Sequence, residues 1–434
     1  MKAIYWASLT MAAVLLAGCN GGGDAASNTT GGTPQSSGGT KKLVIAWAQW
    51  DPAVQMAKLA KDYTKETGVE VEVQQIPWSD FETKIKNFWS SKGTDYDMII
   101  GDSQWLGTAA EGGHYVDLTD WAKTAVKLDD IEPAALKSYG EYEGKLYAMP
   151  CMSDALGFAY RKDLFEDPKN KEAFKAKYGK ELAIPETWDD LKNLAEFFTK
   201  PAEKTYGLAM FYSKNYDGAT MGFEPFLWGY GGDWNNVNTP EAKQGLEMYV
   251  SLKKFCPPGG DTFYFDESLK AFQQGQVAIA MNWFAFFPGL VDATKNKFAD
   301  KTGYFKLPSG PKGKFVSLGG QGISVSAYSA NQEEAKKFVA WLQKEETQAA
   351  WAKLGGLTSN KKVGGTADFA KANPYNSVFT ESAPFLKDFD NSPKYGELMS
   401  AAQTEINAAA SGTKEPAKAL EDLQKQMEEA RKAS

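Results

Sequence analysis

Residues 42–47, KLVIAW, form a short apolar run typical of a buried strand. Asp51 and Pro52 then have the pattern of a helix N-cap followed by proline at the first helical position, and Gly68 is a plausible helix end. The next run, VEVEVQQI at 69–76, alternates apolar and polar residues with period two, as a half-buried strand does. The chain therefore begins its folded part with strand, helix, strand.

The same alternation continues beyond the second strand. Ser79 and Glu82 have capping-box spacing at the start of SDFETKIKNFWS, and YDMIIGDSQW at 96–105 supplies a third strand. Because parallel strands need crossover helices, this β-α-β-α-β order predicts an α/β fold with a parallel sheet and right-handed crossovers. The later apolar runs YGLAM, VAIAMNW, YFKLP and GISVSAY predict further strands, and Thr187 with Asp190, Thr239 with Pro240, and Asn331 with Glu334 predict helix starts.

The N-terminus has the features of an export signal. Lys2 and the apolar segment 3–17 form an n-region and an h-region, and LAGC at 16–19 resembles the lipobox of bacterial lipoproteins, in which the cysteine is lipidated. We therefore expect residues 1–19 to be a lipoprotein signal peptide, with lipidation at Cys19 anchoring the protein to the extracytoplasmic side of a bacterial membrane. Residues 20–41, rich in Gly, Ser, Thr and Asn, should be a flexible linker.

Composition excludes several function classes. Nearly 400 residues remain after the linker, enough for two or three domains, and the net charge of −7 comes from 48 basic and 55 acidic residues without a long basic stripe. Nucleic acid is therefore not an expected partner. His114, the one histidine, is interpreted as a loop or surface residue, and neither a metal site nor a cofactor is expected. Cys151 and Cys256 could pair, but spacing alone does not decide this, and two separate, partly buried thiols are favoured.

Polar and aromatic residues gather just after the predicted strands, where open α/β sheets bind ligands. The candidate ligand-binding residues are Gln49, Trp50, Asp51, Asp102, Ser103, Gln104, Trp105, Asp154, Glu224, Trp228, Asn282, Trp283 and Gln321. Carboxylates and amides can bond several hydroxyls, and indole rings can cover the apolar faces of a pyranose. This mixture favours a sugar.

Most of these residues also have a structural interpretation. Asp51 could be only a helix cap, and Glu224 could merely begin a helix. Glycines 229, 231 and 232 are expected to form a turn and not a phosphate loop, because no Lys-Ser/Thr follows them. The tryptophans at helical positions, Trp89, Trp121, Trp188 and Trp341, are expected in the core.

The order of these segments resembles the extracellular solute-binding proteins of carbohydrate ABC importers, the family that includes maltose-binding protein. The similarity covers essentially the whole mature chain, and its most specific parts are EGKLYAMPCMSDALGFAYRKDLFED, IPETWDDLKNLAEFF, FQQGQVAIAMNW and GGQGISVSAYSANQEEAKKFVAWL. The bulky YGGDWNN turn and Cys151 depart from the family pattern, so the substrate stays open.

The resemblance implies a two-lobed periplasmic-binding-protein-like fold of type II, with the ligand cleft between the lobes. It implies a first lobe of residues 42–148 plus 303–322 and a second of 149–302 plus 323–434, and it adds Tyr395 to the candidate site. The implied function is capture of a mono- or oligosaccharide and its delivery to ABC transporter permease subunits, without catalysis. Two alternatives remain at this point: a surface-anchored glycoside hydrolase, since paired carboxylates in a cleft also suit that chemistry, and a binding protein for a cation such as betaine, held by an aromatic cage.

Overall fold

The computed structural model describes residues 42–432. The predicted signal peptide, the lipidation site Cys19 and the linker 20–41 lie outside the described residues. Within residues 42–432, every helix is too short or too polar to cross a lipid bilayer.

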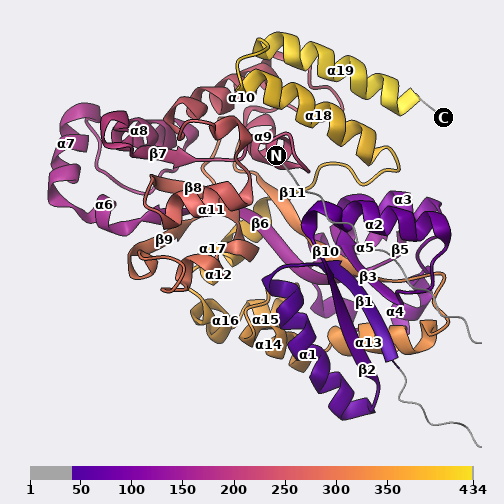
Figure 1. The fold of residues 1–434 in the computed structure, drawn as a ribbon. Coiled ribbons are helices and arrows are strands. Elements are labelled where there is room, and N and C mark those ends of the chain that lie inside the picture. The colour runs from indigo at the N-terminus through magenta and orange to yellow at the C-terminus, as the bar shows by residue number, and fades with distance from the viewer. Residues whose placement is uncertain (1–41, 433–434) are drawn as a thin grey trace, which may run out of the picture. The chain divides into compact units, whose positions relative to one another are not determined.

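One sheet runs through the described chain, in the order β2-β1-β3-β10-β6-β8-β7, with β11 beside β10 and β9 beside β6 (Figure 1). Its strands are β1 (Lys42–Ala48), β2 (Glu70–Ile76), β3 (Met98–Asp102), β6 (Met149–Arg161), β7 (Tyr206–Ala209), β8 (Val277–Trp283), β9 (Thr302–Phe305), β10 (Val316–Val325) and β11 (Leu386–Lys387), while β4 (Glu141–Tyr142) and β5 (Lys145–Leu146) pair separately. β1 pairs in parallel with both β2 and β3, which confirms the predicted parallel order.

Two long strands, β6 and β10, cross between the two halves of this sheet. β10 is antiparallel to β3 on one side and to β6 on the other. In β6, Ala155 pairs with Leu318 of β10, but the next residue, Leu156, pairs with Trp283 of β8. The elements packed on β1, β2 and β3 are called the first lobe below, and those on β7, β8 and β9 the second lobe.

Helices cover both lobes. Those of the first lobe are α1 (Asp51–Thr67), α2 (Trp78–Ser91), α3 (Leu106–Glu111), α4 (Thr119–Ala125), α5 (Pro133–Gly140), α13 (Gln332–Leu342) and α14 (Glu345–Lys353). Those of the second are α6 (Lys162–Glu166), α7 (Pro168–Tyr178), α8 (Trp188–Phe198), α9 (Gly218–Tyr230), α10 (Pro240–Leu252), α11 (Phe265–Gln273), α12 (Pro288–Val291), α17 (Asn376–Ser382), α18 (Tyr395–Ala410) and α19 (Pro416–Lys432). Two short helices, α15 (Lys361–Gly364) and α16 (Ala367–Ala372), follow α14.

The strand pairing divides the chain differently from the predicted lobe boundaries. β9 pairs with the second-lobe end of β6, although residues 303–322 were assigned to the first lobe. α13 packs on α1, with the Tyr63 and Phe338 rings 5.1 Å apart, although residues 323–434 were assigned to the second lobe. The reason is the direction of β10, which runs toward β3 and so delivers the following helices to the first lobe.

Helix starts agree in part with the sequence. Thr187 and Asp190 form a capping box at the predicted start of α8, and the Thr239 hydroxyl accepts a hydrogen bond from the Ala242 N–H at 3.2 Å. The prediction that Asp51 caps α1 is wrong, because Asp51 lies inside that helix and Trp50 is its N-cap. The predicted capping box at Ser79 is also absent, since α2 begins at Trp78 after the N-cap Pro77. Both helices begin within three residues of the end of a strand.

The remaining structural predictions concern single side chains. Cys151 and Cys256 are free and buried, which confirms that they are separate thiols. His114 lies in a loop, half-buried, with its ring stacked 5.2 Å from that of Trp89. Of the tryptophans expected in the core, Trp89, Trp188 and Trp341 are buried and Trp121 is half-buried.

Candidate functional site

A cavity of about 570 Å³ lies where β6 and β10 cross, and residues of both lobes line it. We call it the central cavity. Its lining residues are Trp50, Trp78, Ser79, Asp102, Ser103, Gln104, Asp154, Lys214, Asn215, Tyr216, Asp217, Tyr264, Phe265, Trp283, Phe286 and Leu318 to Gln321. Eight of them, including Trp50, Asp102 and Trp283, stand at the carboxyl end of a strand or within three residues after it, the position at which open α/β sheets bind ligands.

Asp102 is the polar centre of the first-lobe wall. It is the last residue of β3, and its Oδ1 accepts a hydrogen bond of 2.6 Å from Nε2 of Gln321. Gln321 is held in turn by Trp47, whose indole N–H donates to Oε1. The Tyr216 hydroxyl, from the segment between β7 and α9, donates to Oδ2 of Asp102. Burial raises the pKa of the Asp102 carboxyl to about 6, although the hydrogen bonds from Tyr216 and Gln321 oppose that rise.

Asp154 forms part of the cavity floor. It lies in β6, one residue before the change of partner strand, and its Oδ1 accepts hydrogen bonds from the backbone N–H groups of Ala155 at 2.8 Å and Ala285 at 3.1 Å. Burial raises the pKa of this carboxyl to about 8, against the opposing effect of those bonds. Asp154 is therefore mainly protonated at neutral pH and can both donate and accept hydrogen bonds.

A third carboxyl belongs to the second-lobe wall. Asp217 accepts a hydrogen bond from the Tyr264 hydroxyl, and that hydroxyl accepts one of 3.2 Å from the indole N–H of Trp283. Burial raises the pKa of Asp217 to about 7. This chain of contacts fixes the Trp283 ring, which is only 6% exposed, at the edge of the cavity.

Aromatic rings supply the apolar part of the lining. Trp50 meets Trp78 edge to face at 5.2 Å, and it also contacts Phe286 at 5.7 Å. Phe286 stacks on Phe265 at 4.5 Å. The indole N–H groups of Trp50 and Trp78 are buried without a hydrogen-bond partner in this conformation. An unmade hydrogen bond costs about 1 to 3 kcal/mol, so these two donors gain from any rearrangement that gives them an acceptor.

Two smaller cavities share walls with the central one. The first, about 290 Å³, shares Trp50, Trp78, Phe265 and Phe286 with it, and Gln49 and Asp51 line this α1-side cavity. The second, about 370 Å³, shares Lys214 and Tyr216, and Tyr395 of α18 lines this α18-side cavity. Three of the predicted residues thus lie beside the central cavity and not in it.

Four predicted residues line none of these three cavities. Trp105 packs in the core against Phe81 at 5.2 Å. Asn282 accepts a hydrogen bond from the backbone N–H of Trp283 and donates one to the Phe265 carbonyl, so it shapes the wall from behind.

Glu224 and Trp228 are the other two, and both lie on the buried α9. One carboxyl oxygen of Glu224 accepts a hydrogen bond of 3.2 Å from the Trp234 indole, and its other oxygen is buried without a partner. Burial raises the pKa of the Glu224 carboxyl well above its usual value. The ring of Trp228 lies 4.9 Å from the ammonium of Lys387.

Several lining residues were missed from the sequence. Trp78 and Ser79 follow the strand β2, and Lys214 to Asp217 lie in the segment after β7. The rule that located Trp50 and Asp102, that ligands meet the residues following each strand, identifies these as well once it is applied to every strand of the sheet. The same rule also predicts Phe286, which lies three residues after the end of β8.

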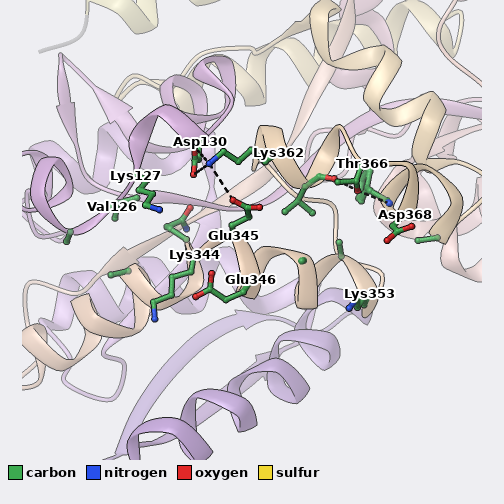
Figure 2. Close-up of a pocket in the computed structure, with 18 residues that line it drawn as sticks. Val126, Lys127, Asp130, Lys344, Glu345, Glu346, Lys353, Lys362, Thr366 and Asp368 are labelled. Carbon is green, nitrogen blue, oxygen red and sulfur yellow. Dashed lines mark hydrogen bonds and ion pairs between the residues drawn. The ribbon is translucent and has the colours of Figure 1, made fainter.

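A larger cavity, about 810 Å³, lies elsewhere, between the α4 to α5 connection and helices α13 to α16 (Figure 2). Three of its charged groups pair with one another: the Lys362 ammonium lies 2.9 Å from Asp130 and 3.4 Å from Glu345. None of the predicted site residues line it, and Phe369 is its one aromatic lining residue. The central cavity is therefore the better candidate for a ligand with both hydroxyls and apolar faces.

Comparison with known proteins gives a consistent picture. The family model for bacterial extracellular solute-binding proteins matches residues 49–349. A probable ABC transporter-binding protein of Deinococcus radiodurans is 28% identical over 397 residues, covering 85% of this chain and 89% of that protein. The mannitol-binding protein of Pseudomonas aeruginosa is 24% identical over 362 residues, covering 80% and 78%.

Solved structures match the fold over most of the chain. An ABC transporter solute-binding protein of Agrobacterium radiobacter in complex with ribitol superposes with a TM-score of 0.77 at 24% identity, covering 90% of this chain and 98% of the other. A maltose-bound protein of T. maritima gives 0.77 at 23% identity, with 90% and 99% covered. The fold is accordingly the two-lobed α/β fold predicted from the sequence.

Proposed function

Because the chain belongs to the bacterial extracellular solute-binding proteins, a family that acts outside the cytoplasm, we propose that it captures a neutral sugar or polyol in the central cavity. The captured solute would then pass to the permease subunits of an ABC transporter. One observation carries the proposal: carboxyls and an amide from both lobes face the same cavity as several aromatic rings. Polyhydroxylated solutes need this combination of many hydrogen-bond partners and flat apolar surfaces.

The protonation of the carboxyls supports a neutral solute. With pKa values raised to about 8 at Asp154 and about 7 at Asp217, these groups carry less than full negative charge at neutral pH. A hydroxyl can donate to an ionised carboxylate or accept from a protonated one, so a polyol suits either state. A quaternary cation would instead gain from fully ionised carboxylates around it.

The comparisons support the same solute class. Relatives include proteins named for mannitol, diacetylchitobiose and maltotriose, and similar structures hold ribitol or maltose. We propose a role as a receptor and not as a hydrolase, so a bound oligosaccharide should be released intact. Incubation with maltotriose or diacetylchitobiose followed by chromatography tests this point, and cleavage that disappears in Asp154→Asn would favour a hydrolase.

We also propose that the protein is lipid-anchored through Cys19. This rests on the LAGC motif at residues 16–19 and on the Gly/Ser-rich tract after it, which would tether the folded part to the membrane. Fractionation of cells that express wild type or Cys19→Ser tests it. Wild type should be found with the membranes and the variant should be released, and membrane retention of the variant would contradict the anchor.

The solute itself is best identified by thermal melting with a panel. We would test mannitol, ribitol, maltose, maltotriose and diacetylchitobiose, with betaine as the cationic alternative. A solute present at 100 times its Kd stabilises the folded protein by about 2.7 kcal/mol, which gives a measurable rise in Tm. Asp154→Asn should reduce the rise, whereas Asp368→Asn, which lies at the larger cavity, should not. A rise in Tm with betaine and with none of the sugars or polyols would mean that the solute is a cation and not a sugar.

A further inference from the structure

The α1-side cavity adjoins the central cavity through a wall of aromatic rings. Trp50 and Trp78 of the first lobe and Phe265 and Phe286 of the second line both cavities. These rings also contact one another, since Trp50 meets Trp78 at 5.2 Å and Phe265 stacks on Phe286 at 4.5 Å. One cluster of rings therefore gives both cavities a flat apolar wall, the kind of surface that the face of a sugar ring packs against.

Polar side chains at the rim complete the lining of the α1-side cavity. Gln49 and Asp51 of the first lobe and Asp266 of the second line it and are exposed. Within residues 42–432, the side chains of Gln49 and Asp51 make no hydrogen bond or ion pair, so their amide and carboxylate groups are free to bond the hydroxyls of a solute. This smaller cavity therefore repeats the combination of flat rings and hydrogen-bonding groups found in the central cavity.

The α18-side cavity also adjoins the central one, but it offers a solute less. The amide oxygen of Gln403 already accepts a hydrogen bond of 2.9 Å from the Thr220 N–H, and its amide nitrogen lies 3.4 Å from the Asn215 carbonyl. The Lys86 ammonium lies 2.6 Å from the Glu82 carboxylate. Three polar groups that line this cavity are thus bonded within the protein, and an added sugar ring finds the better match in the α1-side cavity.

We propose that the protein binds an oligosaccharide of two or more rings, with one ring in the central cavity and the next in the α1-side cavity. This inference rests on the proposed function, since it names the size of the solute and the direction in which it extends. The aromatic wall packs against both rings, and Gln49 and Asp51 bond hydroxyls of the second. A monosaccharide or a polyol fills the central cavity alone and lacks these contacts, so it binds more weakly.

Calorimetric titration of the wild-type protein tests the size of the solute. The matched pairs are glucose with maltose, glucose with cellobiose, and N-acetylglucosamine with diacetylchitobiose, and the polyols are mannitol and ribitol. At least one disaccharide should have a Kd about tenfold or more below that of its monosaccharide, because each added hydrogen bond is equivalent to about two- to tenfold in an equilibrium constant. If a monosaccharide or a polyol binds and no disaccharide binds more tightly, the inference is overturned while the proposed function stands. If none of these solutes binds, the proposed function fails and the inference fails with it.

Variants of the two side cavities test the direction of extension. Gln49→Ala and Asp51→Asn should each raise the Kd of a disaccharide that binds wild type by about three- to tenfold and leave the Kd of its monosaccharide unchanged. Ser400→Ala, at an exposed residue that lines the α18-side cavity, is the matched control and should change neither Kd. A higher disaccharide Kd in Ser400→Ala alone would overturn the direction. An unchanged disaccharide Kd in both α1-side variants, or an equal rise for both solutes, would overturn the contact with a second ring.

Discussion

Replacing Asp154 by Asn should change how stability depends on pH. The folded-state pKa of Asp154 is about 8, against an ordinary value of 3.8, and burial is the cause. A buried carboxyl with a raised pKa stabilises the fold fully below its unfolded-state pKa, and that contribution is lost as the pH rises through the folded-state pKa. From this group alone, the free energy of unfolding of the ligand-free wild type should therefore fall between about pH 4 and pH 8.

The size of the effect follows from the two pKa values. A difference of one in pKa corresponds to about 1.4 kcal/mol, so the loss across this range is about 5 kcal/mol, as an order of magnitude. An asparagine has the shape of the protonated acid, and its oxygen can still accept the N–H groups of Ala155 and Ala285. The free energy of unfolding of Asp154→Asn should therefore lack this fall with pH, so the variant should become more stable relative to wild type as the pH rises.

Urea unfolding of both proteins at pH 4, 5, 6, 7 and 8, without solute, measures this difference directly. Other buried carboxyls, including Asp102 and Asp217, titrate in both proteins, so they cancel in the comparison. Asp129→Asn, at an exposed carboxyl, controls for the change of net charge. A difference between wild type and Asp154→Asn that stays constant within about 1 kcal/mol over this range would refute the assignment of Asp154 as a buried, protonated acid.

Three further predictions concern binding and packing. Trp283→Ala should weaken binding of any sugar that the melting panel identifies while the protein stays folded, because it removes a ring at the cavity edge. Calorimetric titration of the variant and of wild type checks this by comparing their Kd values. Trp188→Ala should lower the free energy of unfolding by about 3 to 5 kcal/mol with little change in Kd, because its buried ring stacks on Phe226 at 3.9 Å and lies outside the cavity lining. Denaturant unfolding and calorimetric titration measure the two quantities, and unchanged stability with a higher Kd would contradict the prediction. A saturating sugar should lower the radius of gyration in small-angle scattering, since residues from both lobes line the site, and an unchanged profile would argue against lobe closure.

The sequence predicted those site residues whose position depends on the order of strands and helices along the chain. Trp50 follows the end of β1 and Asp102 is the last residue of β3, so the alternation of strand and helix was enough to place them at the same edge of a parallel sheet. Asp154 was a candidate among the polar residues near the predicted strands, and the tertiary structure places it within β6. Trp105 and Glu224 have the same residue types in similar positions, but one packs in the core and the other on a helix buried all round.

Local pattern therefore predicted most strands of the main sheet, several of the longer helices, the α/β class and the aromatic and acidic character of the site. Only the tertiary structure decided which of those residues share a cavity, because that depends on where β6 changes partner between Ala155 and Leu156. It alone also brought Tyr216 to Asp102, two residues more than a hundred positions apart in the chain. Burial, which raises the pKa values of the site carboxyls, likewise arises only when segments far apart in sequence pack together and exclude water.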